Sequence, residues 1–161
     1  MTKTTKTAAP EVLERVRDLV EEVLVGTPHF VVELDVRGAP GSQAVDVFLD
    51  SDEALGVGML AQINREIGFL LDTEDVIAGR YRLNVSSPGV DRPLKLPRQY
   101  RKNVGRKLRV HYRKPGGDGY TETLGDLIEA DDEAVEVALS AAEHRRIPYS
   151  DILWAKVQLP W

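Results

Sequence analysis

Ten basic side chains gather just past the middle of the chain, and they are the strongest candidates for chemistry in this sequence. Residues 91–114 hold these ten cations against a single acid, Asp91, which leaves the segment at +9. Clustered Lys and Arg attract phosphate groups, and this density exceeds the mixed-sign pattern of an ordinary protein surface. The segment therefore predicts a nucleic-acid-binding patch made of Arg92, Lys95, Arg98, Arg101, Lys102, Arg106, Lys107, Arg109, Arg113 and Lys114.

Two questions about this segment stay open at the level of sequence. The cations could simply cover a solvated face of a helix and a strand. Tyr100 and Tyr112 lie among them, and an aromatic ring beside Arg is the pairing that stacks on nucleic-acid bases. Both tyrosines are equally suited to a hydrophobic core.

The charge of the remaining chain does not cancel the basic segment. Residues 1–90 carry 8 basic and 15 acidic side chains, a net charge of −7, whereas residues 91–161 carry 13 and 11, a net charge of +2. A domain of about 86 residues has a radius of gyration of about 12 Å, which exceeds the Debye length of about 8 Å at physiological salt. Most of the acidic charge is therefore screened from a phosphate bound at the patch.

Other patterns that carry chemistry are absent or weak. Ser86 and Ser87 do not belong to a Gly-x-Ser-x-Gly pattern, and serines in a tight turn usually bond their own backbone. Two Gly-x-x-Gly matches, at 38–41 and 116–119, fall in predicted hairpin turns, whereas a KH clamp places this motif between helices. The chain has no Walker-type phosphate loop and no cysteine. We predict no catalytic residue, no metal site and no cofactor, because metal-ligand spacing is also missing at His29, His111 and His144.

The first half of the chain predicts an α+β layer with the element order α-β-β-α-β. Apolar residues at helical spacing indicate two amphipathic helices, and alternating residues indicate three strands, of which the first two form an antiparallel hairpin. Two helices on a three-stranded sheet satisfy this pattern. The predicted helices cover 11–25 and about 53–70, and the predicted strands cover 30–36, 45–50 and 80–85.

The second helix carries three detailed expectations. Ser51 or Asp52 is expected to cap its N-terminus. Gly56 and Gly58 are expected either to allow close packing on the sheet or to mark a frayed first turn, because glycine costs about 0.8–1 kcal/mol against Ala inside a helix. The buried side is expected to contain Leu55, Met59, Leu60, Ile63, Ile67 and Leu70.

The second half predicts a short helix followed by a small all-β domain. Short alternating segments separated by turn residues indicate an SH3-like or Sm-like barrel. Gly125 lies inside one of these strands and predicts a bend or a bulge there. The predicted helix covers 97–103, and the predicted strands cover 106–112, 120–129, 134–139, 145–149 and 154–159.

A turn between the two halves is expected to act as a rigid elbow. Pro fixes φ near −65° and Gly can supply a positive φ, so the sequence Ser-Ser-Pro-Gly favours one fixed geometry. We predict a disordered arm over 1–10, an α+β domain over 11–90 and a barrel domain over 91–161. No apolar run approaches the roughly 18 residues that cross a membrane, and we expect a cytoplasmic protein. The predicted elbow consists of Ser86, Ser87, Pro88, Gly89 and Asp91.

The same turn carries a family signature. The segment from Tyr81 to Leu94, YRLNVSSPGVDRPL, resembles the central motif of the ribosome maturation factor RimP family. The similarity continues through Tyr100-Arg101, Gly105, residues 125–127 and residues 147–152, and so covers nearly the whole chain. Two positions depart from the family pattern, which usually has an acid at Asn84 and Leu at Val90.

This resemblance implies a non-enzymatic assembly factor. It implies an N-terminal domain of KH-like topology, a C-terminal SH3-like or Sm-like barrel, and binding to the immature small (30S) ribosomal subunit in the bacterial cytoplasm. The implied partners are rRNA and the ribosomal protein at the decoding site, and we expect a monomer. The alternative is a free Sm-like RNA-binding regulator that forms rings. An enzyme with a dispersed site is disfavoured by the missing motifs.

Overall fold

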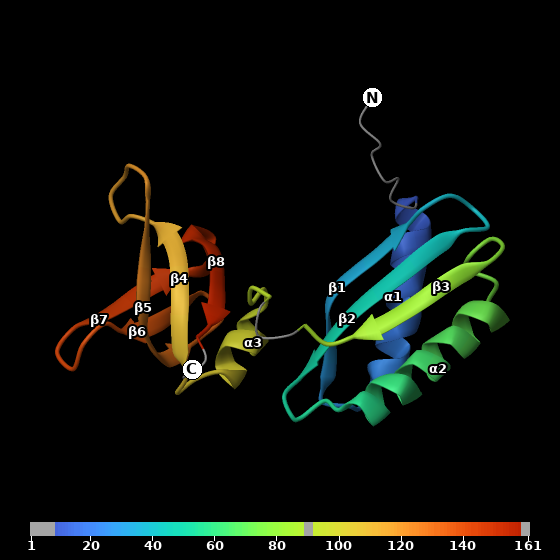
Figure 1. Ribbon diagram of the computed structural model, residues 1–161, viewed down its shortest axis with the longest axis horizontal. Coiled ribbons are helices and arrows are strands. Elements are labelled where there is room, and N and C mark those ends of the chain that lie inside the picture. The colour runs from blue at the N-terminus through green and yellow to red at the C-terminus, as the bar shows by residue number, and fades with distance from the viewer. Residues whose placement is uncertain (1–8, 89–91, 159–161) are drawn as a thin grey trace. The chain divides into compact units, whose positions relative to one another are not determined.

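The computed structural model describes residues 9–88 and 92–158 (Figure 1). The chain divides into two compact units, Met1–Pro88 and Gly89–Trp161, which we call unit 1 and unit 2. Each unit has its own sheet and its own hydrophobic core. The predicted arm over 1–10 lies almost entirely outside the described residues, and Pro10 already belongs to the first helix. No helix among the described residues is long and apolar enough to cross a membrane.

Unit 1 has the predicted element order α-β-β-α-β. Pro10 occupies the first helical position, where its missing N–H costs nothing. Gly26, with φ of +79°, follows the end of that helix and turns the chain away. The elements are α1 (Pro10–Leu24), β1 (His29–Arg37), β2 (Gln43–Ser51), α2 (Val57–Thr73) and β3 (Tyr81–Ser86).

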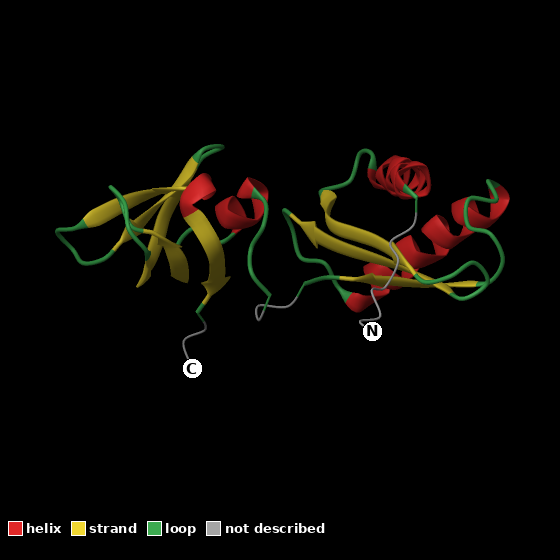
Figure 2. Ribbon diagram, turned by 90° about the horizontal axis from the view of Figure 1, so that it is seen from above, coloured by secondary structure: helices red, strands yellow, loops and turns green. Residues whose placement is uncertain are grey.

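The sheet of unit 1 has the order β1-β2-β3. Strands β1 and β2 form the predicted antiparallel hairpin, and β3 joins β2 in parallel after the crossover through α2. Helices α1 and α2 contact each other and share one core with a single face of the sheet (Figure 2). The α+β layer predicted from the sequence is therefore confirmed. The fully buried members of this core include Val16, Val20, Val36, Val45, Val47, Leu49 and Ile67.

The N-terminus of α2 differs from the prediction. The helix begins at Val57, not near 53, and its N-cap is Gly56 without a side-chain cap. Ser51 cannot cap the helix because it ends β2 and is fully buried, with its hydroxyl bonded to neighbouring backbone and to His29. At Gly58 an added Cβ would meet nothing within 4 Å, so this glycine belongs to an open first turn and does not serve close packing.

The buried side of α2 also needs a correction. Ile63 and Ile67 are buried as predicted, but Met59 is 42% exposed. Leu71, which was not predicted, is 1% exposed and completes the core. The late start of the helix explains Met59, because this residue lies in the first turn, ahead of the stretch that faces the sheet.

Unit 2 contains a short helix and a five-stranded antiparallel sheet of order β7-β6-β5-β4-β8. The sheet packs on a core that includes Tyr100, Leu108, Tyr112, Leu127 and Ile147. Its first and last strands, β4 and β8, lie side by side (Figure 1). The elements are α3 (Pro97–Lys102), β4 (Lys107–Arg113), β5 (Tyr120–Ala130), β6 (Ala134–Ala138), β7 (His144–Pro148), the 3-10 turn η1 (Tyr149–Asp151) and β8 (Ile152–Val157).

The irregularity of β5 lies three residues beyond the predicted position. Gly125 pairs regularly with Leu108, and the register shifts only between Leu127 and Glu129. Glycine is required at 125 for another reason: an added Cβ would lie 2.2 Å from the Ala138 carbonyl oxygen. Gly125 therefore allows β6 to approach β5 closely, and it does not form a bulge.

Candidate nucleic-acid interface

The ten predicted cations fall into two groups on unit 2. One group lies on and around α3, and the other lies along β4 and the turn that follows it. Strand β4 alternates, with Leu108, Val110 and Tyr112 buried, so the cations between them face solvent. The α3 group is Arg92, Lys95, Arg98, Arg101, Lys102 and Arg106, and the β4 group is Lys107, Arg109, Arg113 and Lys114.

Helix α3 holds its cations in place through two buried side chains. Gln99 is 1% exposed and its Oε1 accepts the backbone N–H of Lys95 at 2.7 Å and of Leu96 at 3.0 Å. Tyr100 is 2% exposed and its ring lies 5.0 Å from that of Tyr149. These contacts anchor one side of the short helix in unit 2, and Arg101 and Lys102 on its other side are exposed.

Carboxylates from elsewhere in unit 2 reduce the charge of the predicted patch. Arg101 pairs with Asp132 at 2.9 Å and Lys107 pairs with Asp126 at 3.7 Å. Arg109 pairs with Glu122 at 2.9 Å. All these side chains are more than a third exposed, so each pair contributes at most about 1 kcal/mol. The net charge at the patch is nevertheless lower than +9. That sum counts only residues 91–114, and these three carboxylates come from outside that segment.

The two tyrosines inside the basic segment are core residues. Tyr100 and Tyr112 are each 2% exposed, which settles the open question in favour of packing. Burial raises the pKa of Tyr100 far above its ordinary value. The Tyr112 hydroxyl accepts a hydrogen bond from Arg145 at 3.0 Å, and this bond raises the pKa of the Arg145 guanidinium further. Neither ring is available to a base.

Three other rings form a stacked row on the solvent side of the sheet. His111 on β4 lies between Trp154 on β8, with ring centroids 5.5 Å apart and planes at 12°, and Tyr120 on β5, at 5.8 Å and 19°. The register explains this arrangement, since His111 is directly opposite Trp154 and diagonal to Tyr120. We call these three residues the ring row.

The ring row was missed in the sequence because its members are separated by up to 43 positions. A signal did exist for His111. The alternation that buries Val110 and Tyr112 places the residue between them on the solvent face. The pairing of β8 with β4 cannot be obtained from alternation, so Trp154 could not be assigned to the same row.

Cations surround the ring row on the solvent face of β8, β4 and β5, which we call the outer face. Lys156 places its ammonium 5.6 Å from the centroid of Trp154, within range of a cation–π interaction. Arg113 is directly opposite Tyr120 in the register. Among the described residues, neither Arg113 nor Lys156 has a carboxylate partner in an ion pair. The outer face comprises Lys107, Arg109, His111, Arg113, Tyr120, Glu122, Leu124, Asp126, Trp154 and Lys156.

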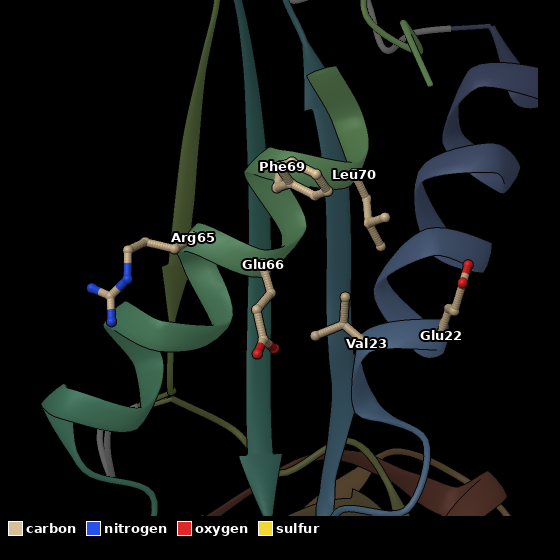
Figure 3. Close-up of a pocket in the computed structure, with 6 residues that line it drawn as sticks. All are labelled: Glu22, Val23, Arg65, Glu66, Phe69 and Leu70. Carbon is tan, nitrogen blue, oxygen red and sulfur yellow. The ribbon is translucent and has the colours of Figure 1, made fainter. Parts of the chain in front are cut away.

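Unit 1 has a different surface feature, a groove between α1 and α2. It has a volume of about 440 Å³ (Figure 3). Figure 3 shows Val23 and Leu70 pointing toward the space between the helices, with the Phe69 ring above it. Phe69 is 68% exposed. Helices α1 and α2 with residues 74–75 carry nine acids and three arginines, so the groove is apolar with acidic surroundings. Its lining residues are Glu22, Val23, Arg65, Glu66, Phe69 and Leu70.

The predicted elbow is only partly described. Ser86 is the last residue of β3, and Ser87 and Pro88 follow it outside any helix or strand. Gly89 and Asp91 lie outside the described residues. The role of this turn in setting the angle between the units therefore stays a prediction.

One comparison with known families bears on the chain. Residues 19–91 match the family model described as the RimP N-terminal domain. The matched range runs from Leu19 in α1 through all three strands of the first sheet and includes the Ser-Ser-Pro-Gly turn. The family resemblance predicted from residues 81–94 is confirmed by this match.

Proposed function

We propose that this chain, a member of the RimP family, is a ribosome maturation factor that helps to assemble the small (30S) ribosomal subunit. The observation that carries the proposal is the match of residues 19–91 to the RimP N-terminal domain. The proposed action is binding, without catalysis and without a cofactor, to the immature subunit in the cytoplasm. The basic residues of α3 and β4 are the proposed contacts to rRNA, and the ribosomal protein at the decoding site is the proposed protein partner.

The strand arrangement supports a finer proposal for the folds of the two units. In unit 2 the last strand returns beside the first, and a 3-10 turn separates β7 from β8. This order fits a small SH3-like or Sm-like barrel, although no pairing links β7 to β8 within residues 92–158. The α-β-β-α-β order of unit 1 fits a KH-like topology.

Phosphate binding makes the proposed function sensitive to salt. If about five cations contact phosphates, a single-strand slope of about −0.7 per contact predicts binding weaker by about a hundredfold between 50 and 200 mM salt. A protein partner bound mainly through apolar contacts would give a much smaller change.

The test is co-sedimentation of the full chain with immature small subunits. Replacement of Arg98, Arg101, Arg106 and Lys107 by Glu should abolish it while the circular dichroism spectrum stays that of the unmodified protein. A matched control makes the same change of net charge on unit 1, at Arg15, Arg17, Arg65 and Arg80, and should still co-sediment. Equal binding by both variants would remove the basic patch from the mechanism.

The alternative function, a free Sm-like RNA-binding regulator, has one supporting observation. Strands β7 and β8 are the two edges of the sheet in unit 2, and exposed edges can pair between copies. A ring-forming regulator should give an oligomer of defined size in light scattering, whereas an assembly factor should give a monomer. A monomer that is enriched on free small subunits over whole ribosomes would exclude the alternative.

A further inference from the structure

We propose that the outer face binds single-stranded RNA by stacking an unpaired base on the Tyr120 end of the ring row. This inference deepens the proposed function, on which its RNA partner rests. Sheet surfaces that present aromatic rings commonly bind unpaired bases in this way.

The ring row is already arranged as a stack. Its planes deviate by only 12° and 19°, and its centroids are 5.5 and 5.8 Å apart. Each ring is attached to a paired strand, so the backbone register fixes its position before any ligand arrives. A base can extend such a row as a fourth ring without requiring the protein to reorganise.

The two ends of the row differ in how much of the last ring is available. At one end the ammonium of Lys156 lies over Trp154, 5.6 Å from the ring centroid. At the other end Tyr120 is 47% exposed. Strand β6 does not cover it, because the pairing of β5 with β6 begins only at Asp126. The available stacking surface is therefore the Tyr120 ring.

A cation lies beside this ring. Arg113 is directly opposite Tyr120 in the register, and directly opposite residues have Cβ atoms about 5 Å apart. Arg113 forms no ion pair with any described carboxylate, whereas Arg109, four residues earlier on the strand, is paired with Glu122. A nucleotide whose base stacks on Tyr120 therefore has a guanidinium within reach for its phosphate.

The geometry distinguishes unpaired from paired RNA. In an A-form duplex the bases are stacked on each other and the deep major groove excludes side chains. A duplex would use the cations of the outer face and leave the ring row without a ligand. The proposal is therefore specific for single strands.

The experiment measures the affinity of the full chain for two fluorescein-labelled probes by anisotropy. The probes are an eight-nucleotide oligouridine and a 16-base-pair RNA duplex. Tyr120→Leu, which keeps an apolar side chain but removes the π-face, should weaken binding to oligouridine by about tenfold. Binding to the duplex and the slope of log K against log salt should stay unchanged. Tyr120→Phe should bind like the unmodified protein.

Two control variants complete the design. Ile128→Ala, at an exposed position of the same strand that lies outside the outer face, should leave both affinities within twofold. Arg113→Gln should weaken both probes and reduce the salt slope by about 0.7 for the single strand and about 0.9 for the duplex. Thermal unfolding of each variant verifies that the sheet of unit 2 is intact.

Three results would overturn the proposal. They are an oligouridine affinity of Tyr120→Leu within twofold of the unmodified protein, an equal loss on both probes, and the absence of measurable oligouridine binding by the unmodified protein. The proposed function fails separately. It falls if the unmodified full chain does not co-sediment with immature subunits, whatever Tyr120→Leu does.

Discussion

The open faces of the two sheets show how similar layers come to present different chemistry. In unit 1 hydrogen bonds between side chains cross the polar face of the sheet. Asp46 accepts a bond from Arg37 Nε at 2.9 Å and from Asn84 Nδ2 at 2.8 Å, linking all three strands. In unit 2 the corresponding face carries the ring row, and its Arg113 and Lys156 have no ion-pair partner among the described residues.

The two units also differ in where their exposed apolar side chains lie. Unit 1 presents Phe69 on its helices, beside the apolar groove with its acidic surroundings. Unit 2 presents its rings on the sheet itself. Charge and apolar exposure therefore differ from element to element, and the net charge of −5 describes neither surface. Four changes test this contrast, in order of decreasing expected effect.

Gly125→Val should give the largest effect and should be confined to unit 2. The added Cβ would lie 2.2 Å from the Ala138 carbonyl oxygen, a backbone atom that cannot move without breaking the pairing of β5 and β6. We expect a loss of at least about 3 kcal/mol in the free energy of unfolding of unit 2. Amide NMR spectra should keep the dispersed signals of unit 1 and lose those of unit 2.

A glycine in unit 1 provides the control for that change. Gly58→Ala meets no atom within 4 Å and should stabilise unit 1 by up to about 1 kcal/mol. If Gly125→Val also removed the signals of unit 1, the two cores could not be treated as independent.

Ser51→Ala should destabilise unit 1 by about 2 kcal/mol. Ser51 is fully buried, and its hydroxyl accepts the Glu53 N–H at 3.1 Å and lies 2.8 Å from His29 Nδ1. Alanine leaves these groups without that partner. Urea unfolding measures the change, and Ser42→Ala, at an exposed turn, should shift the midpoint by less than about 0.5 kcal/mol. A small effect at Ser51 would mean that water replaces the hydroxyl.

Asp46 makes the stability of unit 1 dependent on acid. Partial burial alone would raise its pKa, but hydrogen bonds from Asn84 and Arg37 outweigh burial and hold the pKa of this carboxyl below its ordinary value. Its stabilisation is complete above the ordinary carboxyl pKa of about 4 and is lost as the pH falls through the lower, folded-state pKa.

Asp46→Asn should therefore flatten the acid side of the stability profile of unit 1 and cost about 1 kcal/mol at pH 7. The measurement is the free energy of unfolding from pH 2 to 7. Asp35→Asn, whose side chain is 41% exposed, should keep the profile of the unmodified protein. Identical profiles for Asp46→Asn and the unmodified protein would show that the sheet face of unit 1 is not held by this carboxylate.

Phe69→Gln should have the smallest effect on stability, within about 0.5 kcal/mol, since 68% of the side chain is exposed. Ile67→Ala, two residues earlier and fully buried, should cost about 3 kcal/mol. Thermal unfolding compares the two. A large loss at Phe69 would show that the ring supports the fold, and the groove would then no longer contrast with the core-facing side of α2.

Local signals predicted the elements well, and non-local ones account for the errors. Helix α1 followed from its apolar spacing, Pro10 and Gly26, all of which lie in the helix or directly after it. The start of α2 was placed too early because Ser51 carries a capping side chain that the end of β2 uses for buried contacts instead. An N-cap contributes only about 1 kcal/mol to stability, so it does not outweigh the burial of Ser51 at the end of β2.

The candidate site shows the same division. The ten cations could be found in the sequence because they all fall within residues 91–114. Their carboxylate partners Glu122, Asp126 and Asp132 could not, because strand pairing brings them near. The ring row depends on the same strand pairing, which cannot be predicted from the periodicity of a single strand.

The pairing of β4 with β8 also means that the ring row cannot form until late in synthesis of the described chain. His111 is synthesised 43 residues before Trp154, and the two rings meet only when the last described strand of the sheet is in place. At roughly 5–20 residues per second, translation separates them by about 2–9 s. During this interval a nascent chain can pair β4 with β5 but not with β8. The ring row can therefore form only after Trp154 has been synthesised.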